Sequence, residues 1–205
     1  HPASRLTLGG TASATLAATF TVGGDVTIGS GATLDVSASN YGLSVGGDWS
    51  NSGTFNGRSG TVTFNGTGAQ AINGTAASQT FYDVTLSKTA GTTLSVGGST
   101  TSLTVNNLTQ TTGNFTAPAT LDVNGNVTLT AGTFTAGASL TVAGNWTKAS
   151  AAVFTPGSGT VTFDGTGAQA INGTSTSQAF NDVEVAKTAG TLLNTGGSTT
   201  SLTVN

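Results

Sequence analysis

The feature that most constrains this 205-residue chain is a long internal duplication. Residues 60–106 and 159–205 are identical at 36 of 47 positions, at a constant offset of 99. Both copies begin with Gly-Thr-Val-Thr-Phe and end with Leu-Thr-Val-Asn. A fixed long period is typical of stacked repeat architectures, in which each unit packs only on its neighbours. The duplication therefore predicts an elongated array.

A shorter period lies within the duplication. Apolar-polar-apolar triplets alternate as half-buried strands do. Their last apolar residues are Val22, Val45, Phe64, Val84, Val105, Val123, Val142, Phe163, Val183 and Val204. The mean interval between them is about 20 residues, a length typical of one structural repeat. Five such units fill the long period, so the spacing predicts about ten short coils.

Composition favours an all-β fold. The chain contains 31 Gly, 43 Thr and 21 Ser, and Gly and Asn between the triplets suit sharp corners because they tolerate positive φ. We predict an all-β, single-stranded parallel β-helix, or β-solenoid, that continues over residues 1–205. Residues 20–106 would form its first repeat and 107–205 its second, with 1–19 as an N-terminal extension or a first coil. A β-sandwich is the main rival, but it needs no period this regular.

Three strings carry a family resemblance: Gly-Thr-Val-Thr-Phe-Asn-Gly-Thr-Gly at 60–68, Lys-Thr-Ala-Gly-Thr at 88–92 and 187–191, and Leu-Thr-Val-Ala-Gly-Asn-Trp-Thr at 140–147. They resemble the Gly/Thr-rich repeats of large secreted bacterial or archaeal surface proteins, which are adhesin-like right-handed β-helices. The resemblance implies extracellular display, adhesion or matrix building, and it brings no catalytic residues.

The sequence offers little for catalysis or metal binding. His1 is the only histidine, and the chain has no Cys and only 13 charged residues. We therefore expect no enzyme, no cofactor and no metal site. Asp25 and Asp48 follow Gly-Gly pairs and are interpreted as turn-capping residues rather than calcium ligands. The net charge of −3 argues against nucleic acid as a partner, and no membrane span is expected.

Two duplicated pairs of residues allow a special function. Lys88 and Lys187 could form isopeptide bonds with Asn, but we expect ordinary exposed lysines. Trp49 and Trp146 follow Gly-Gly-Asp and Ala-Gly-Asn, and they could stack on sugars. Their matched position at a corner favours a packing role instead.

The two ends of the pattern suggest the function. Neither end shows a capping segment, and an uncapped β-helix exposes strand edges and core side chains. We therefore expect a secreted, extracellular or cell-surface subunit that polymerises head to tail with itself into a filament or surface fibre. The expected interface contains Leu6, Leu8, Leu16, Phe20, Leu193, Leu202 and Val204.

Alternatives remain open. Apolar residues fall on even positions from Leu6 to Phe20, so this stretch could be a donor strand that inserts into a neighbouring subunit. The chain could also be a stalk or binding segment of a larger adhesin with surface glycans as ligands, since the absence of Met fits a processed chain or a piece of a longer one. A third possibility is an ice-binding β-helix, although Thr-x-Thr pairs do not recur once per coil.

Overall fold

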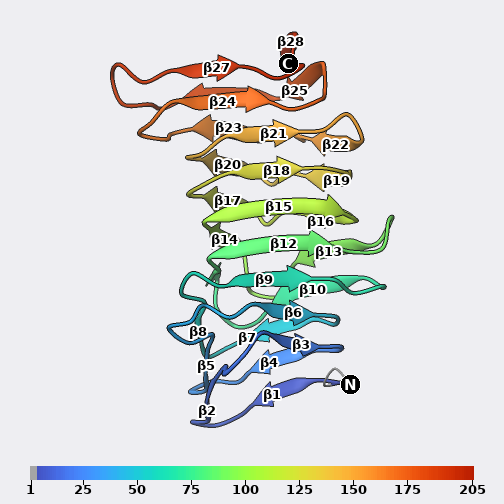
Figure 1. Cartoon of the computed structure of the whole chain (residues 1–205), viewed down its shortest axis with the longest axis vertical. Coiled ribbons are helices and arrows are strands. Elements are labelled where there is room, and N and C mark those ends of the chain that lie inside the picture. Colours follow the sequence, from blue (N-terminus) through green and yellow to red (C-terminus); the bar gives the residue numbers. More distant parts are fainter. Residues whose placement is uncertain (1–3) are drawn as a thin grey trace.

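The chain is a parallel β-solenoid of about nine turns with about 21 residues per turn and no helix among residues 4–205. A computed structural model describes these residues, and His1 lies outside them. The turns stack along the long axis, with the N-terminal turn at one end and the C-terminal turn at the other (Figure 1). All pairs of neighbouring strands are parallel, so the predicted fold class is confirmed.

Each turn contributes three short strands, which gives the solenoid three faces. The first face contains β1 (Leu6–Leu8), β4 (Val26–Ile28), β7 (Trp49–Asn51), β10 (Gln70–Asn73), β13 (Thr93–Val96), β16 (Asn114–Thr116), β19 (Gly132–Thr135), β22 (Ala152–Thr155), β25 (Ser177–Phe180) and β28 (Ser201–Val204).

The second face contains β2 (Ser13–Thr15), β5 (Thr33–Asp35), β8 (Thr54–Asn56), β11 (Ser78–Thr80), β14 (Ser102–Val105), β17 (Thr120–Val123), β20 (Ser139–Val142), β23 (Thr160–Phe163) and β26 (Asp182–Val185). The third face contains β3 (Phe20–Val22), β6 (Leu43–Val45), β9 (Thr61–Phe64), β12 (Asp83–Ser87), β15 (Asn107–Thr112), β18 (Val127–Leu129), β21 (Trp146–Lys148), β24 (Gln169–Asn172) and β27 (Leu193–Thr195).

The prediction of about ten coils was close to the observed nine turns, but the long period does not contain the five whole coils that we expected. The 28 strands make nine turns and one further strand, since each turn contains three. The series of apolar triplets changes face at two points. From Val84 in β12 it passes to Val105 in β14, and from Val183 in β26 to Val204 in β28, so each of these steps covers two strands instead of three.

The second copy of the duplicated sequence is therefore rotated around the solenoid axis relative to the first. Strands β9 to β14 and β23 to β28 carry the two copies of the duplicated sequence, and they lie 14 strands apart. Fourteen strands make 4⅔ turns. As a result β9 lies on the third face whereas its copy β23 lies on the second, and β12 and β26 differ in the same way. Equivalent residues of the two repeats therefore point in directions about one face apart.

Alternation within each strand builds a continuous core. Inward residues such as Val62 and Phe64 in β9 are buried, while Thr61 and Thr63 between them are half-buried on the outer surface. The next turn places apolar residues on apolar residues, because Val62 pairs with Val84 and Phe64 with Leu86. Burial of these apolar ladders stabilises a stack whose single turns are too small to fold alone.

Aromatic side chains fill the place where the hydrogen-bonded sheet is interrupted. The sheet ends after β8 and a new one begins with β11; the copies of these strands, β22 and β25, show the same interruption. Trp49 packs at a centroid distance of 4.8 Å from Phe55 and 5.1 Å from Phe81. Its Nε1 donates to Gln79 Oε1 at 3.4 Å. The aromatic cluster therefore holds together two turns that the backbone does not join here.

The second repeat contains the same cluster, formed by Trp146, Phe154, Phe180 and Phe163. Trp146 Nε1 donates to Gln178 Oε1 at 3.0 Å. Both tryptophans are completely buried, so their predicted packing role is confirmed and neither ring is available to stack on a sugar.

Candidate functional site: the two open ends of the solenoid

The C-terminal end exposes apolar side chains of the last turn. Val185 at the end of β26 is 55% exposed, Leu192 before β27 63%, and Leu202 and Val204 in β28 42% and 51%. Leu193 in β27 is half-buried. No further strand of the described chain covers β26, β27 or β28. This end therefore presents open strand edges together with an uncovered cross-section of the core.

The first copy of the repeat is an internal control for this end. Leu86, Leu103 and Val105 occupy the positions of Val185, Leu202 and Val204, at an offset of 99. They are 0%, 2% and 1% exposed, because β15 and β17 of the next turns lie on β12 and β14. The contrast shows that the first copy is covered by the next turns, whereas no strand within residues 4–205 lies on the second copy.

The N-terminal end presents the complementary edge. Leu6 and Leu8 in β1, Leu16 after β2 and Phe20 in β3 are half-buried and pack on the core from one side only. Leu6 pairs with Val26 and Phe20 with Leu43 of the next turn. Residues 6–22 thus form the first turn of this chain, in register with the second.

The predicted interface residues divide between these two ends. Leu6, Leu8, Leu16 and Phe20 lie at one end of the solenoid, and the other three predicted residues lie at the opposite end (Figure 1). They cannot meet within one chain. Sequence reasoning missed Val185, although its copy Leu86 in the first repeat marks an inward apolar position, and it missed Leu192, whose counterpart Thr93 is polar.

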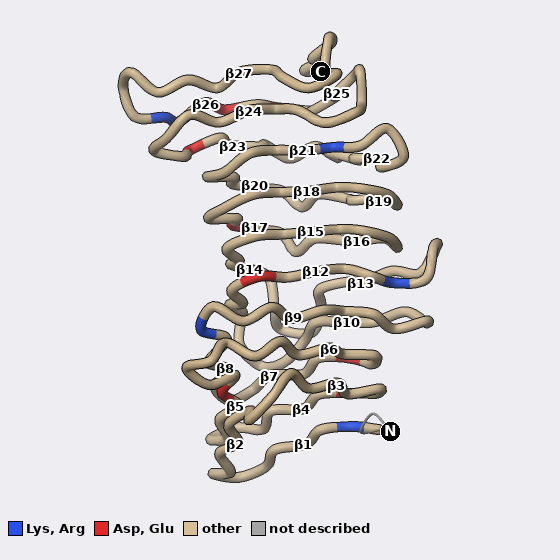
Figure 2. Tube along the Cα trace, in the orientation of Figure 1, with Lys and Arg blue, Asp and Glu red and all other residues tan. Residues whose placement is uncertain are grey.

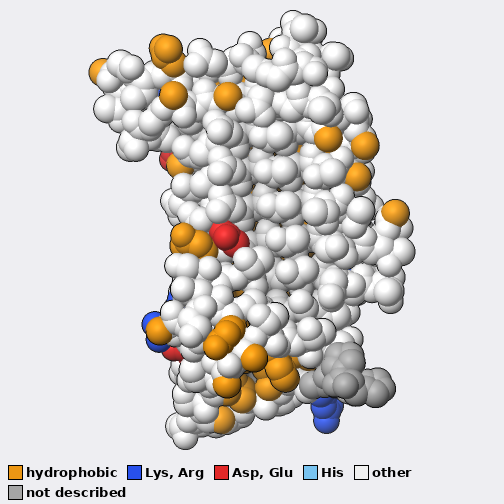
Figure 3. All heavy atoms as spheres, viewed as in Figure 1, with side chains coloured by type: hydrophobic (Ala, Val, Ile, Leu, Met, Phe, Trp, Pro, Cys, Tyr) orange, Lys and Arg blue, Asp and Glu red, His pale blue; other side chains and the backbone are white. Residues whose placement is uncertain are grey.

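Charge is sparse along the solenoid. Figure 2 shows Lys, Arg, Asp and Glu scattered over different turns without a cluster, and Figure 3 shows apolar side chains gathered on the lowest, N-terminal turns. Near the C-terminal edge, Glu184 of β26 points outward and accepts a hydrogen bond from Thr162 Oγ1 at 3.2 Å. The ends are therefore open to apolar and backbone pairing, with little electrostatic repulsion.

Asparagine and aspartate side chains form ladders along the corners. Asp25 Oδ1 accepts from the backbone N–H of Asp48 at 2.8 Å, and Asp48 Oδ1 accepts from that of Ala71 at 2.7 Å. The predicted capping role of both aspartates is confirmed, although each caps the next turn and not its own. Residues 4–205 contain no group of three His, Cys, Asp or Glu side chains suited to a metal ion.

The second repeat has a corresponding ladder of asparagine side chains, which lies along the third face. Asn107 Oδ1 accepts from the N–H of Asn126, Asn126 Oδ1 from Asn145, and Asn145 Oδ1 from Ala170, each at 2.8 Å. A shallow polar trough of about 250 Å³ lies beside it, lined by Thr61, Asp83, Thr85, Asn107, Thr109, Asn126 and Thr128. No aromatic side chain lines this trough, although aromatic rings are the usual platforms for a sugar.

Lys88 is buried, so the expectation of an exposed lysine was wrong. Its side chain is 2% exposed, and Nζ donates to Gly66 O at 3.2 Å, Gly68 O at 2.9 Å and Gln70 Oε1 at 2.6 Å. Burial lowers the pKa of the amine, and the charge of Asp48 opposes this shift. Three oxygen acceptors suit an ammonium group, and none of them belongs to an Asn side chain.

Lys187 repeats this arrangement one face away. Its Nζ donates to Gly165 O at 2.8 Å, Gly167 O at 2.7 Å and Gln169 Oε1 at 2.7 Å. Asn145 stands where the first repeat has Asp48. The pair of lysines therefore fastens a Gly-Thr-Gly corner to the next turn in each repeat, which is a structural role.

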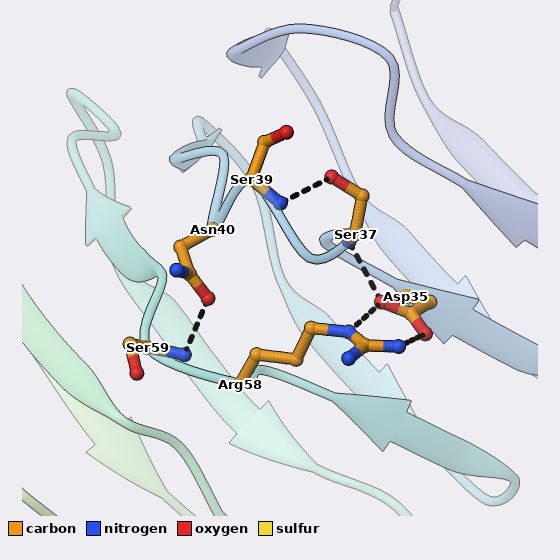
Figure 4. Close-up of polar contacts among 6 residues, drawn as sticks. All are labelled: Asp35, Ser37, Ser39, Asn40, Arg58 and Ser59. Atoms are coloured by element: carbon orange, nitrogen blue, oxygen red, sulfur yellow. Dashed lines mark hydrogen bonds and ion pairs between the residues drawn. The ribbon is translucent and has the colours of Figure 1, made fainter.

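One ion pair joins the end of β5 in the second turn to the loop after β8 in the third turn. Arg58 Nε and Nη2 donate to Asp35 Oδ1 and Oδ2 at 2.6 and 2.7 Å (Figure 4). The Arg58 hydrogen bond is the largest cause that lowers the pKa of Asp35, to about 2, and the N–H of Ser37 adds to it. In the same view Ser59 N–H donates to Asn40 Oδ1 at 3.0 Å. These bonds fix the loop over residues 36–42.

Thr-x-Thr pairs are spread over all three faces. The pairs at 61/63 and 128/130 belong to the third face, 133/135 to the first and 160/162 to the second. A different hydroxyl array lies on the second face. In β11, β14, β17, β20 and β23 the outward residues form two rows, Ser78–Ser102–Thr120–Ser139–Thr160 and Thr80–Thr104–Asp122–Thr141–Thr162. One carboxylate interrupts the second row.

No protein-family model, curated protein or solved structure matches this chain. In residues 4–205 no helix is present that could cross a membrane. The class of protein is thus defined by its fold, a parallel β-solenoid built from repeats. Within that fold the two open ends are the candidate site.

Proposed function

We propose that this protein is a structural subunit of an extracellular filament or surface fibre, and that it assembles head to tail by stacking of the open solenoid ends. The observation that carries the proposal is the contrast between the two copies of one sequence. Leu103 and Val105 are covered by the next turn, whereas Leu202 and Val204 are about half exposed. A second copy of this chain supplies the cover.

Stacking would satisfy both parts of the open end at once. Backbone N–H and C=O groups of an edge strand pair with those of an added strand, and the core ladders continue across the junction. The two ends differ from each other, so the contact is heterologous and does not close, which produces a fibre. The partner is therefore the protein itself.

Concentration-dependent assembly tests the proposal. Sedimentation velocity over a wide concentration range, with negative-stain images of the concentrated sample, should show growing linear particles. Leu202→Lys places a charge on the C-terminal edge, where it would be buried in the junction, and should abolish assembly. Thr141→Lys adds the same charge on a side face and serves as the matched control.

The result that contradicts the proposal is a monomer at every concentration, with or without sonicated seeds. Equal effects of Leu202→Lys and Thr141→Lys on assembly would also contradict it, because assembly would then depend on net charge rather than on the end. Thermal unfolding of both variants checks that each one is folded.

A longer adhesin stalk is a second candidate that the same edge supports. In that case further repeats of one chain would cover Leu202 and Val204, as β17 covers Leu103 and Val105 in the first copy. The polar trough on the third face would then be a candidate site for surface glycans. The length of the coding region and a glycan-array measurement distinguish this candidate from the filament subunit.

The hydroxyl rows on the second face favour a third candidate, an ice-binding surface. Rows of Ser and Thr repeat once per turn from β11 to β23, at the strand spacing of about 4.8 Å. A measurement of thermal hysteresis tests this candidate directly, and growth of ice crystals without hysteresis would exclude it.

A further inference from the structure

The junction between the two repeats lies inside this chain and serves as a template for a junction between chains. The first repeat ends with β14, and the second begins with β15, which follows β14 almost directly along the chain. Across this junction β15 lies on β12, β16 on β13 and β17 on β14. Three strands of the incoming repeat therefore cover three strands of the preceding one.

The strands at the C-terminal end are copies of the first three of these strands, and the strands at the N-terminal end hold positions equivalent to the last three. At the C-terminal end β26, β27 and β28 correspond to β12, β13 and β14 at an offset of 99. At the N-terminal end β1 corresponds to β15, since Leu6-Thr7 matches Leu108-Thr109, and β3 corresponds to β17, since Phe20 and Val22 take the places of Leu121 and Val123. Strand β2 lies between them, as β16 does.

From this correspondence we infer that the next copy docks rotated by one face, so that its β1 lies on β26, its β2 on β27 and its β3 on β28. The inference rests on the proposed head-to-tail assembly and specifies its geometry. Residues 4–205 contribute 28 strands, which is 9⅓ turns. Successive copies in the fibre are therefore related by a rotation of about 120° around the axis.

The register follows residue by residue from the internal junction. Val84 pairs with Leu108 and Thr85 with Thr109, which places Leu6 and Thr7 of the incoming copy on Val183 and Glu184. Leu103, Thr104 and Val105 pair with Leu121, Asp122 and Val123. The corresponding contacts between copies are Leu202 with Phe20, Thr203 with Thr21, and Val204 with Val22.

Side-chain chemistry agrees with this register. Inward apolar residues meet inward apolar residues on the three faces, with Leu193 on Ala14 of β2, except at Thr195 of β27, which faces inward beside Ile171 and stands where the first copy has Val96. Outward, Glu184 meets Thr7 and Thr203 meets Thr21, so no like charges oppose each other. The apolar ladders of the core therefore continue through the junction except at Thr195.

Docking without rotation leaves part of the junction empty. If β1 of the next copy lay on β28, both strands would belong to the first face, and the place of one strand would stay open above β26 and above β27. Val185, whose copy Leu86 is 0% exposed, would keep its exposure of 55%. With rotation by one face, β1, β2 and β3 of the next copy cover β26, β27 and β28 in turn, because they follow β28 in the order of the spiral.

Engineered disulfides test the phase of docking, and the chain is suited to them because it has no Cys. Thr7, Glu184 and Thr203 all point outward and are exposed. The variant Thr7→Cys/Glu184→Cys should form an intermolecular ladder on non-reducing gels, because neighbouring strands place the two Cα atoms within disulfide range. The variant Thr7→Cys/Thr203→Cys, whose cysteines would meet only in unrotated docking, is the matched alternative.

The expected result is that the Thr7/Glu184 variant cross-links roughly ten-fold faster than the Thr7/Thr203 variant, since only the former falls in the range of about 4.4–6.8 Å between Cα atoms. Faster cross-linking of the Thr7/Thr203 variant overturns the rotated docking. The absence of cross-links in both variants also overturns the rotated docking. Sedimentation then separates two cases. If assembly persists, only the rotation is wrong; if assembly is absent, the proposed function is wrong as well.

Discussion

Leu103 and Leu202 allow one substitution to be compared in two environments of the same repeat. Leu103 is 2% exposed in β14, and its copy Leu202 in β28 is 42% exposed. Leu→Ala in a packed core costs about 2–5 kcal/mol, because a cavity adds to the lost burial. We expect Leu103→Ala to cost about 3 kcal/mol in the free energy of unfolding.

Leu202→Ala should cost much less in the isolated chain. Full burial of a leucine contributes about 1.5–3 kcal/mol, and Leu202 has lost only part of its exposure. Solvent can also fill the space that the truncation leaves. We therefore expect a loss of about 1 kcal/mol, confined to the last turn, because solenoid ends open locally.

In the assembled fibre, Leu202→Ala should also weaken the contact between copies, because docking buries the part of Leu202 that is exposed in the isolated chain. Docking takes Leu202 from 42% exposed to the 2% of Leu103, which is about two fifths of its full burial and contributes about 1 kcal/mol. Leu202→Ala should thus weaken head-to-tail association about five-fold. Urea denaturation of dilute protein measures the first effect, and sedimentation equilibrium measures the second.

Two results would contradict an uncovered C-terminal edge that takes part in the contact. One is an equal loss of stability for Leu103→Ala and Leu202→Ala in the dilute chain, which would mean that the last turn is already covered. The other is an unchanged association constant for Leu202→Ala, which would remove the C-terminal edge from the contact.

Three further predictions concern the stability of the single chain. Gly132→Ala should lower the free energy of unfolding, measured in urea, by about 2 kcal/mol or more, because the φ of Gly132 is +84° and a Cβ would collide with the carbonyl of Gly113 in the turn below. Gly68→Ala is the neutral control, because a Cβ at Gly68 would meet open space. Lys88→Met should cost about 1–3 kcal/mol in urea, because three oxygens lose their donor, and a neutral result would contradict the locking role. The pKa of Asp35 is about 2, lower than its ordinary value, so its pair with Arg58 stabilises the fold above about pH 4 and loses this effect as pH falls toward 2; Arg58→Met should remove that part of the acid transition in a pH series of thermal melts.

The alternation of apolar and polar residues was enough to predict the solenoid. Inward Val and Leu at every second position, with Gly and Asn at the corners, leave stacking as the way to bury so short a unit. The number of turns was not predictable in this way, because turns vary in length. Ser102 pairs with Thr120 across a short turn, whereas Trp146 pairs with Ile171 across a longer one.

The rotation of the repeat was hidden for a related reason. Triplets on different faces have the same pattern, so Val84 and Val105 appear to be one turn apart although they lie on different faces. Only strand pairing distinguishes them. The burial of Lys88 was also unpredictable, since its acceptors Gly66 and Gly68 come from the preceding turn.

The open ends were accessible from sequence in part. Leu202 and Val204 end the duplicated pattern, and their copies are followed by another strand, which pointed to an uncovered edge. The full extent of that edge includes Val185 and Leu192, because β26 and β27 lie beside β28 at the end of the spiral. Sequence distance does not show this proximity.

Helical reconstruction of the assembled protein by cryo-electron microscopy would show directly how neighbouring copies stack. Head-to-tail docking predicts a continuous solenoid in which neighbouring copies are related by a rotation of about 120° and a rise of about 45 Å, since 9⅓ turns advance about 4.8 Å each. Fibres whose copies associate side by side, or stack with no rotation and a gap at the junction, would contradict it.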